Sequence, residues 1–285
     1  MNLNNENSFW WFLTKSLILD YKFWRVSPWI FRKKAVFLLK KYYLLFLYVF
    51  GGRKFSLGES FVNLFGRDIF FDSHFGLAGW QATLSGHQKM LNLARVSNVR
   101  TVIDVGANVG FFSMLMRERF PKATVYAIEP VQKTFSALEK NFEGDTKTVL
   151  TNKAISNFCG TSKMVFDEQE SAKSFLGKGV EEVAVQTLDN FVDEHGIGVV
   201  DILKIDVETF EKHVLEGAKN VLGKTRYLFI GVAVEDNANY SFSELIGLLY
   251  RKGRYNYQLK AFRNFVDKGE GEMPVVDFLF ENIQR

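Results

Sequence analysis

The sequence predicts an α/β fold with a doubly wound, mostly parallel sheet and a helical arm at the N-terminus. Short apolar segments of strand character alternate with segments of helical spacing from residue 99 onward. The strand segments are almost continuously apolar, which is typical of strands that helices cover on both faces. The sequence GGRK at 51–54 marks a joint, so we expect an arm over residues 1–56 and one domain over residues 57–285.

The elements of this domain follow one another along the chain. A hairpin is expected in FVNLFGRDIFF, and a helix or a pair of helices in residues 80–97. The expected strands are then TVIDVG, TVYAIEP, TVLTNKAIS, VDILKID and RYLFIGVAV, closed by YNYQLKAF and VVDFLFEN. The expected helices are residues 110–119, VQKTFSALEKNF, TFEKHVLEGAKNVLG and SFSELIGLLYRKG, the third of which should end at Gly223.

The arm is basic and rich in aromatic residues. Residues 1–56 hold ten Lys or Arg and two acids, whereas the rest of the chain holds 26 basic and 30 acidic residues. Charged residues interrupt every apolar run, so we expect neither a bilayer span nor a signal peptide. Residues 9–50 combine Trp and Tyr with Lys and Arg, a mixture that favours a membrane interface. The tryptophans expected to contact lipid are Trp10, Trp11, Trp24 and Trp29.

Other readings of the arm stay open. Its helices would also serve as ordinary core packed on the body, or as a contact in a homo-oligomer. The single cysteine, Cys159, has no internal disulfide partner, and the four histidines lack the spacing of a metal site. We therefore expect no metal, and a cytoplasmic protein held peripherally at the inner face of a membrane.

The turn TVIDVGANVGFF, residues 101–112, carries an acid and two glycines at the end of the first core strand. In doubly wound sheets, ligands bind beyond the carboxyl ends of the strands. Gly106 and Gly110 permit a tight turn and the close approach of a ligand, while the following helix offers free N–H groups. Glu129 ends the next strand, where an acid can accept hydrogen bonds from two ribose hydroxyls. The pattern indicates a nucleoside cofactor.

The charge of the turn bears on which cofactor this is. A dinucleotide brings a pyrophosphate, and the fingerprint for it, G-x-G-x-x-G, is not matched by GANVG. Asp104 would repel phosphate, whereas S-adenosylmethionine (SAM) carries an ammonium and a sulfonium and no phosphate. The pattern D-x-G-x-x-x-G followed by Glu129 therefore favours SAM. The structural alternative is an ordinary strand-turn-helix with a capping aspartate.

Five segments resemble a known family. VIDVGANVGFFS, AIEP, NKAISNFCG, VQTLDNF and VDILKIDVETFEKHVLEGA occur in the order and spacing of the FkbM-type SAM-dependent methyltransferases, over residues 99 to about 235. The resemblance implies a seven-stranded class I methyltransferase sheet and methyl transfer, usually to a hydroxyl of a sugar or polyketide-type acceptor. It also implies a cofactor site in which the methionine part of SAM meets Asp104, Gly106, Asn108 and Gly110, the ribose Glu129, and the adenine the region of Ala154.

The segment LKIDVE supplies the candidates for catalysis. Strand alternation puts Lys204, Asp206 and Glu208 on one face. Such groups at the end of a central strand are costly unless they are paired or contact a ligand. Methyl transfer to oxygen needs alignment and a base that removes the hydroxyl proton. We expect Asp206 or Glu208 to be that base, with Lys204 pairing with an acid or steering the acceptor; a purely structural ion pair is the alternative.

Two positions depart from the family pattern and keep a second class of function open. Thr209 stands where the family usually has Gly after DVE, and Gly231 replaces an acid commonly found on the fifth strand. A SAM-binding sensor or scaffold without catalysis is therefore an alternative to an O-methyltransferase for small-molecule or glycan acceptors. A nucleic-acid methyltransferase is less favoured, because no N/D-P-P-Y/F tetrapeptide is present and the positive charge is interleaved with bulky aliphatic residues.

Overall fold

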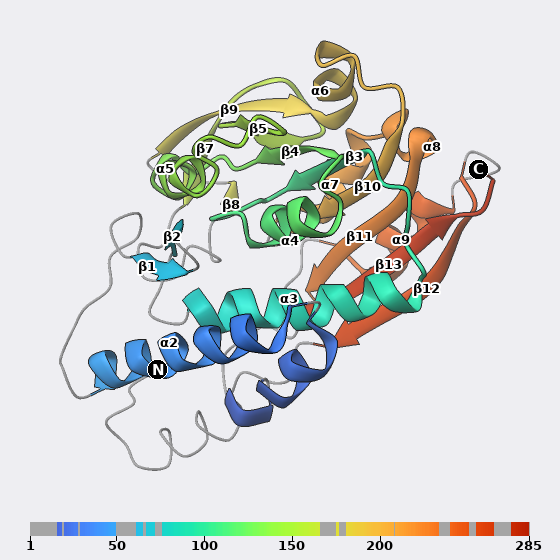
Figure 1. Ribbon diagram of the computed structural model, residues 1–285. Helices are drawn as coiled ribbons and strands as arrows, with labels where there is room; N and C mark the ends of the chain where they lie inside the picture. The colour runs from blue at the N-terminus through green and yellow to red at the C-terminus, as the bar shows by residue number, and fades with distance from the viewer. Residues whose placement is uncertain are drawn as a thin grey trace.

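The computed structural model describes most of the chain (Figure 1). The described residues are 16–18, 20–27, 29–49, 61–64, 67–71, 76–165, 175–176, 181–207, 209–233, 240–250, 255–264 and 275–284. Glu208, Trp10 and Trp11 lie outside them.

A seven-stranded sheet in the order β12-β13-β11-β10-β3-β4-β5 forms the centre of the molecule. Its parallel strands are β3 (Thr101–Val105), β4 (Thr124–Ile128), β5 (Thr148–Thr151), β10 (Val200–Ile205) and β11 (Thr225–Ala233). β13 (Val275–Asn282) runs antiparallel between β11 and β12 (Tyr257–Asn264). The chain moves outward from β3 to β5 and then returns to β10 on the other side of β3, so the switch point of the strand order lies between β3 and β10. The predicted fold class is confirmed.

Helices cover both faces of this sheet. On β3, Val102 belongs to one apolar core and Ile103 to the other, as the alternation of a strand requires. The first core is shared with α3 (Gly76–Leu93), α4 (Phe111–Arg119) and α5 (Gln132–Asn141). The second is shared with α6 (Leu188–Glu194), α7 (Glu211–Glu216), α8 (Val221–Lys224) and α9 (Phe242–Leu249). The strands are almost continuously apolar because helices bury them on both faces of the sheet.

The expectation of one strand over TVLTNKAIS was wrong. The segment divides into β5 and β6 (Ala154–Ser156), and β6 joins a separate four-stranded sheet in the order β6-β9-β7-β8. The other strands of that sheet are β7 (Gly160–Val165), β8 (Phe175–Leu176) and β9 (Glu181–Thr187). The break lies at Asn152, whose side-chain amide donates to the carbonyl oxygens of Glu129 and Pro130, both at 2.9 Å. This side chain ties the chain to the end of β4 and ends β5.

The expectation of one helix ending at Gly223 was also wrong. Two short helices, α7 and α8, replace it, and Gly217 caps the first. A Cβ on Gly217 would lie 2.1 Å from the carbonyl oxygen of Ser156, so the chain crosses β6 in backbone contact. The carboxylate of Asp189 then accepts the backbone N–H groups of Asn220 and Val221 and starts α8. The end of α7 and the start of α8 are therefore both set by contacts with segments that are distant in the sequence.

The arm lies along α3 (Figure 1). It contains a helical segment at 20–26 and α2 (Phe31–Val49), and the predicted hairpin follows as β1 (Phe61–Leu64) paired with β2 (Arg67–Phe70). Phe23, Trp29 and Phe37 are buried with Trp80 of α3, with ring centroids 5.6 Å apart for the Trp29–Trp80 pair. This side of the arm is ordinary core, and the expectation that Trp29 contacts lipid was wrong.

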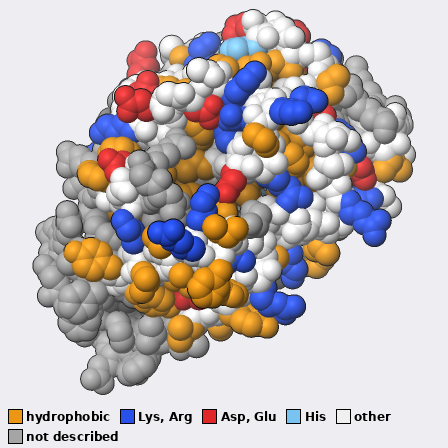
Figure 2. Space-filling view, viewed as in Figure 1, with side chains coloured by type: hydrophobic (Ala, Val, Ile, Leu, Met, Phe, Trp, Pro, Cys, Tyr) orange, Lys and Arg blue, Asp and Glu red, His pale blue; other side chains and the backbone are white. Residues whose placement is uncertain are grey.

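A polar network on the same side ties the arm to the body. The ammonium of Lys41 lies 2.5 Å from Asp20 and 2.8 Å from the amide oxygen of Gln81 in α3. The other side of the arm is exposed, and Figure 2 shows hydrophobic side chains gathered on the surface over the arm helices. Among the described residues, no helix combines the length and apolar character needed to cross a bilayer.

Candidate functional site

The loop that follows β3 runs close to the loops after β4 and β10. Its backbone N–H groups at Gly106 and Ala107 both donate to the carbonyl oxygen of Ile128 at 3.0 Å. Gly106 has φ 76°, and a Cβ there would lie 1.9 Å from the carbonyl oxygen of Asp206. Gly110 has φ 94°, and a Cβ there would lie 2.7 Å from the side chain of Leu138. The packing of this chain thus requires both predicted glycines before any ligand is considered.

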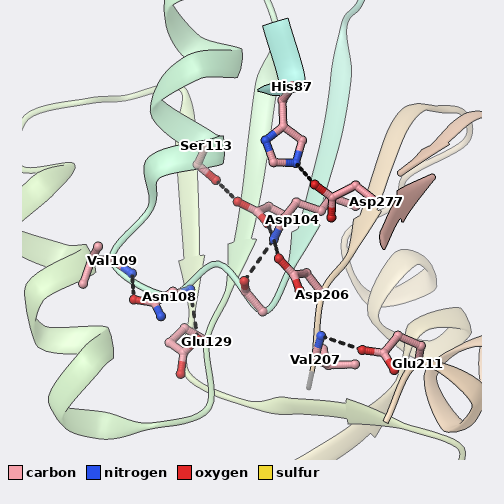
Figure 3. A network of polar contacts seen from close by, with 12 residues as sticks. His87, Asp104, Asn108, Val109, Ser113, Glu129, Asp206, Val207, Glu211 and Asp277 are labelled. Atoms are coloured by element: carbon pink, nitrogen blue, oxygen red, sulfur yellow. Dashed lines mark hydrogen bonds and ion pairs between the residues drawn. The ribbon is translucent and has the colours of Figure 1, made fainter. Parts of the chain in front are cut away.

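Asp104 lies at the centre of the site (Figure 3). Its side chain is fully buried, and Oδ2 accepts the hydroxyl of Ser113 at 2.7 Å while Oδ1 lies 3.1 Å from the ammonium of Lys204. Lys204 also lies 3.4 Å from Asp206 Oδ2 and donates to the carbonyl oxygen of Gly106 at 3.2 Å. The prediction that Lys204 and Asp206 share one face of the strand is confirmed by this ion pair.

The protonation of Lys204 follows from these contacts. Burial lowers the pKa of Lys204, but Asp104 and Asp206 more than offset that effect, so that its pKa is raised above the usual value. Lys204 therefore stays an ammonium at neutral pH and is unsuited to act as a base. The side chain of Asp206 is 39% exposed, in contrast to that of Asp104, so it is the carboxylate of this pair that is accessible from outside.

Glu129 joins the loops after β3 and β4. Its Oε2 accepts the backbone N–H of Asn108, and its Oε1 accepts that of Val131, both at 3.0 Å. Burial raises the pKa of Glu129 to about 7, although both hydrogen bonds oppose the shift. Asn108 has φ 51°, and its side-chain oxygen accepts the N–H of Val109 at 2.6 Å, which explains why Asn suits this turn.

Ala154 lies in the small second sheet. It is buried in an apolar cluster with Val131, Met164, Val183 and Val185. Val131 comes two residues after Glu129, so the cluster adjoins the loop after β4. The structure thus brings the predicted ribose and adenine regions to neighbouring positions.

A second polar group lies beside Asp206 and was not predicted. Asp277 of β13 accepts two hydrogen bonds from Arg263 of β12, at 2.6 and 3.0 Å, and lies 3.6 Å from Nε2 of His87 in α3. Burial raises the pKa of Asp277, against the effect of Arg263, and burial lowers the pKa of His87 well below its usual value. The sequence signal was an acid within the apolar strand VVDFLF, which favours a buried partner.

Gly231 connects the two polar groups. It pairs with Asp277 in the sheet, and a Cβ there would lie 2.9 Å from Asp206 Oδ1 and 3.6 Å from Asp277 Oδ1. A side chain at this position would crowd Asp206, and the neighbouring strand already supplies an acid. Charged residues therefore lie in sequence across the sheet: Asp104 on β3, Asp206 at the end of β10, Asp277 on β13 and Arg263 on β12.

The loop after Asp206 is held by a buried acid that was not predicted either. Glu211 accepts the N–H of Val207 at 3.3 Å and the hydroxyl of Tyr240, and burial raises the pKa of Glu211 to about 7. Thr209, between these residues, has φ 72°, in the left-handed region that favours glycine.

The chemistry of this site suits a cationic cofactor. Asp104 and Asp206 contact the ammonium of Lys204, and Glu129 lies close enough to interact with it electrostatically. An ammonium and a sulfonium are attracted to such a site, and a pyrophosphate is repelled. The loop at 106–110 and Glu129 fit the methionine part and the ribose of SAM. A doubly wound sheet with this site at its switch point defines a class I SAM-dependent methyltransferase.

The chain belongs to the FkbM methyltransferase family. The family described as "Methyltransferase FkbM domain" matches residues 104–259, which is more than half of the chain. "Methyltransferase 1" of Beauveria bassiana is 28% identical over 142 residues, 41% of this chain and 57% of the relative. "31-O-demethyl-FK506 methyltransferase FkbM" of Streptomyces tacrolimicus is 27% identical over 154 residues, 42% of this chain and 59% of the relative. The chain therefore spans less than two thirds of the length of these relatives.

Solved structures of low sequence identity are also similar. The putative transferase PH0793 of Pyrococcus horikoshii has 14% identity and a TM-score of 0.49, covering 83% of this chain and 80% of that chain. Precorrin-6y C5,15-methyltransferase of Geobacter metallireducens has 12% identity and a TM-score of 0.43, covering 70% and 88%.

Proposed function

We propose that this SAM-dependent methyltransferase methylates a hydroxyl oxygen of a small-molecule or glycan acceptor. The observation that carries the proposal is the half-exposed carboxylate of Asp206, fixed by Lys204 at the switch point beside the cofactor loop. A hydroxyl has to lose its proton as the new C–O bond forms, and a carboxylate at this place can accept it.

SAM, when bound, supplies a methyl group on a positively charged sulfur. Lys204 binds Oδ2 of Asp206 and so orients this carboxylate, while the absence of a side chain at Gly231 leaves Oδ1 uncrowded. Oδ1 of Asp206 would accept the proton of the acceptor hydroxyl, and bound SAM would supply the methyl group that the hydroxyl oxygen receives. Lys204 remains an ammonium throughout, since Asp104 and Asp206 hold its proton.

Asp206→Asn tests the assignment of the base. The amide keeps the shape of the side chain but accepts no proton, so we expect turnover to fall about 100-fold or more while SAM affinity changes less than threefold. Asp193→Asn, on the exposed surface of α6, is the matched control and should behave as the parent protein. Equal turnover of Asp206→Asn and the parent would remove Asp206 from this role.

Radiolabelled SAM tests the class of acceptor. Cell glycans, lipids and small metabolites are incubated with the protein, and the labelled product is treated with base and with glycosidases. An alkali-stable label on a sugar or another hydroxyl compound supports the proposal. Label on RNA or DNA would overturn it, and SAM binding without any transfer would favour a sensor.

The proposal extends to the place of action. We place the enzyme at the cytoplasmic face of a membrane, held peripherally through residues 9–50. The supporting observation is the charge of residues 1–56, with ten basic residues against two acids.

A further inference from the structure

The helical segment at 20–26, with residues 16–18 before it, carries apolar side chains on its outward side, in addition to Phe23, which is buried in the core on its inner side. Its buried positions, which face the body, include Ser16, Asp20 and Ser27. Its outward positions include Leu17 at 55% exposure, Ile18 at 46% and Tyr21 at 64%. A helix between a protein core and water normally turns its apolar stripe inward and its polar stripe outward. This surface is therefore poorly suited to permanent contact with water.

The apolar surface continues onto the start of α2. Trp24 is 37% exposed and its ring contacts that of Phe31, with centroids 5.1 Å apart. Phe31 is itself 73% exposed, and Ile30 beside it 68%. We call these six residues the outer face: Leu17, Ile18, Tyr21, Trp24, Ile30 and Phe31. Isolated exposed hydrophobics are common on proteins, but a contiguous group of this kind marks an interaction surface.

The exposed charges that these helical segments themselves carry are all of one sign. Lys22, Arg25 and Arg32 are exposed on the same helical segments. The sequence from 16 to 49 contains a single acid, Asp20, which is buried against Lys41. An occupant of this face consequently has to offer negative charge together with an apolar layer.

We propose that the outer face binds an anionic lipid surface, with its aromatic and aliphatic side chains at the depth of the headgroups. Lys and Arg attract acidic headgroups, while Trp and Tyr favour the interface and Leu and Ile the start of the acyl chains. A symmetric contact with a second copy would instead place the cations of one outer face against those of the other. This inference deepens the proposed place of action and does not depend on the identity of the acceptor.

The docking geometry follows from the buried side of the arm. Trp29 and Lys41 attach the arm to Trp80 and Gln81 at the beginning of α3. Six residues further along, α3 carries Gly86 and His87, which meet Arg263 and Asp277 beside Asp206. The arm is thus part of the same rigid body as the catalytic edge, and lipid binding would set the orientation of that edge relative to the membrane.

Vesicle flotation of the full-length chain tests this inference. Vesicles of phosphatidylcholine alone are compared with vesicles that also contain phosphatidylglycerol, and the parent protein should float only with the latter. A variant with Ile18→Ser, Trp24→Ser and Phe31→Ser removes apolar contacts and should lose binding even at low salt. A variant with Lys22→Gln, Arg25→Gln and Arg32→Gln should bind about 100-fold more weakly, since each cation near the surface contributes about a fivefold factor. High salt should release the parent protein only in part.

The controls separate lipid binding from loss of folding and from the proposed reaction. A variant with Phe158→Ser and Phe262→Ser, at exposed positions outside the arm, should float as the parent does. Calorimetric SAM binding is measured for every variant, so that a folded cofactor site is established independently of flotation. A chain without the arm is unsuitable, because it would uncover Trp80 and Leu84.

Two results would overturn the inference. One is a parent protein that stays at the bottom with the anionic vesicles. The other is an apolar triple variant that binds them as well as the parent does. If the parent is instead a dimer in light scattering and the apolar variant a monomer, the outer face is a contact between copies of this chain.

Discussion

At the scale of single residues, Glu129 shows how burial and ligand binding oppose each other. Burial raises its pKa from 4.5 to about 7 in the folded chain, so ionisation of this acid costs stability. Because the folded-state pKa exceeds the unfolded value, the stabilising effect of the proton is present below about pH 4.5. It is lost as the pH rises to about 7, and corresponds to roughly 3 kcal/mol. The cations and ribose hydroxyls of SAM favour the opposite, ionised form.

The affinity for SAM should therefore rise with pH. Between pH 5.5 and 7 the ionised fraction of Glu129 increases about 16-fold, and we expect the association constant to increase by about the same factor. Isothermal titration at several pH values measures this dependence. Glu129→Gln, which has no proton to lose, should bind SAM weakly and with a flat profile; a flat profile in the parent protein would contradict the prediction.

Thr209 shows the conformational cost of a departure from the family pattern. A β-branched residue with φ 72° costs about 1–2 kcal/mol relative to glycine, which the family usually has here. The neighbouring buried Glu211, with its bonds to Val207 and Tyr240, holds the loop in this conformation. The departure therefore carries a conformational cost but does not displace Asp206 from Lys204.

The sequence predicted part of this site because some of its geometry is local. Lys204 and Asp206 share a face since alternation is a property of any strand, and Gly106 and Gly110 follow from the turn. In the group of His87, Arg263 and Asp277, His87 of α3 lies far along the chain from the two residues on β12 and β13, so no local pattern predicts the group. Glu129 was predicted as an acid at a strand end, but its shifted pKa depends on tertiary burial.

At the scale of elements, the correct and the wrong predictions of strands and helices have the same physical origin. The seven strands of the main sheet follow from apolar runs that are long enough to be recognised alone. β6 and β8 are short, and β9 alternates in burial because one side of that strand is exposed. The sequence predicts one continuous helix at 209–223, but the structure divides it into α7 and α8 where Gly217 crosses the backbone of Ser156. Such a division cannot be predicted from the local sequence, because it depends on contact with the distant segment that contains Ser156.

Gly217→Ala tests whether the contact between Gly217 and the backbone of Ser156 requires a glycine. The added Cβ would lie 2.1 Å from a backbone oxygen, which cannot rotate away as a side chain does, so we expect a loss of roughly 1–3 kcal/mol in the free energy of unfolding. Gly247→Ala, in α9 with no atom within 4 Å of the added Cβ, is the matched control. It should be neutral or stabilise the protein by up to about 1 kcal/mol through helix propensity. Urea denaturation of both variants measures the difference, and equal midpoints would refute the argument.

At the scale of the whole molecule, the arm has two sides with separate roles. Its inner side extends the first core through Phe23, Trp29 and Phe37, and its buried pair Asp20–Lys41 reaches Gln81 of α3. Burial lowers the pKa of Lys41 although Asp20 opposes the shift, which is the signature of a charge enclosed by the fold. The inner side of the arm thus belongs to the same apolar core as α3, α4 and α5.

The two tryptophans of the arm that the structure describes should separate these roles. Trp29 is 7% exposed within an aromatic cluster, so Trp29→Ala removes core volume and should lower the free energy of unfolding of the entire protein by roughly 3–5 kcal/mol. Trp24 is 37% exposed on the outer face, so Trp24→Ala should change stability by less than about 1 kcal/mol while weakening vesicle binding. Thermal unfolding followed by circular dichroism and by SAM binding should give one shared transition in each case, because arm and sheet belong to one core. A separate early transition of the arm in the parent protein, with the cofactor site still intact, would show instead that the two parts fold independently.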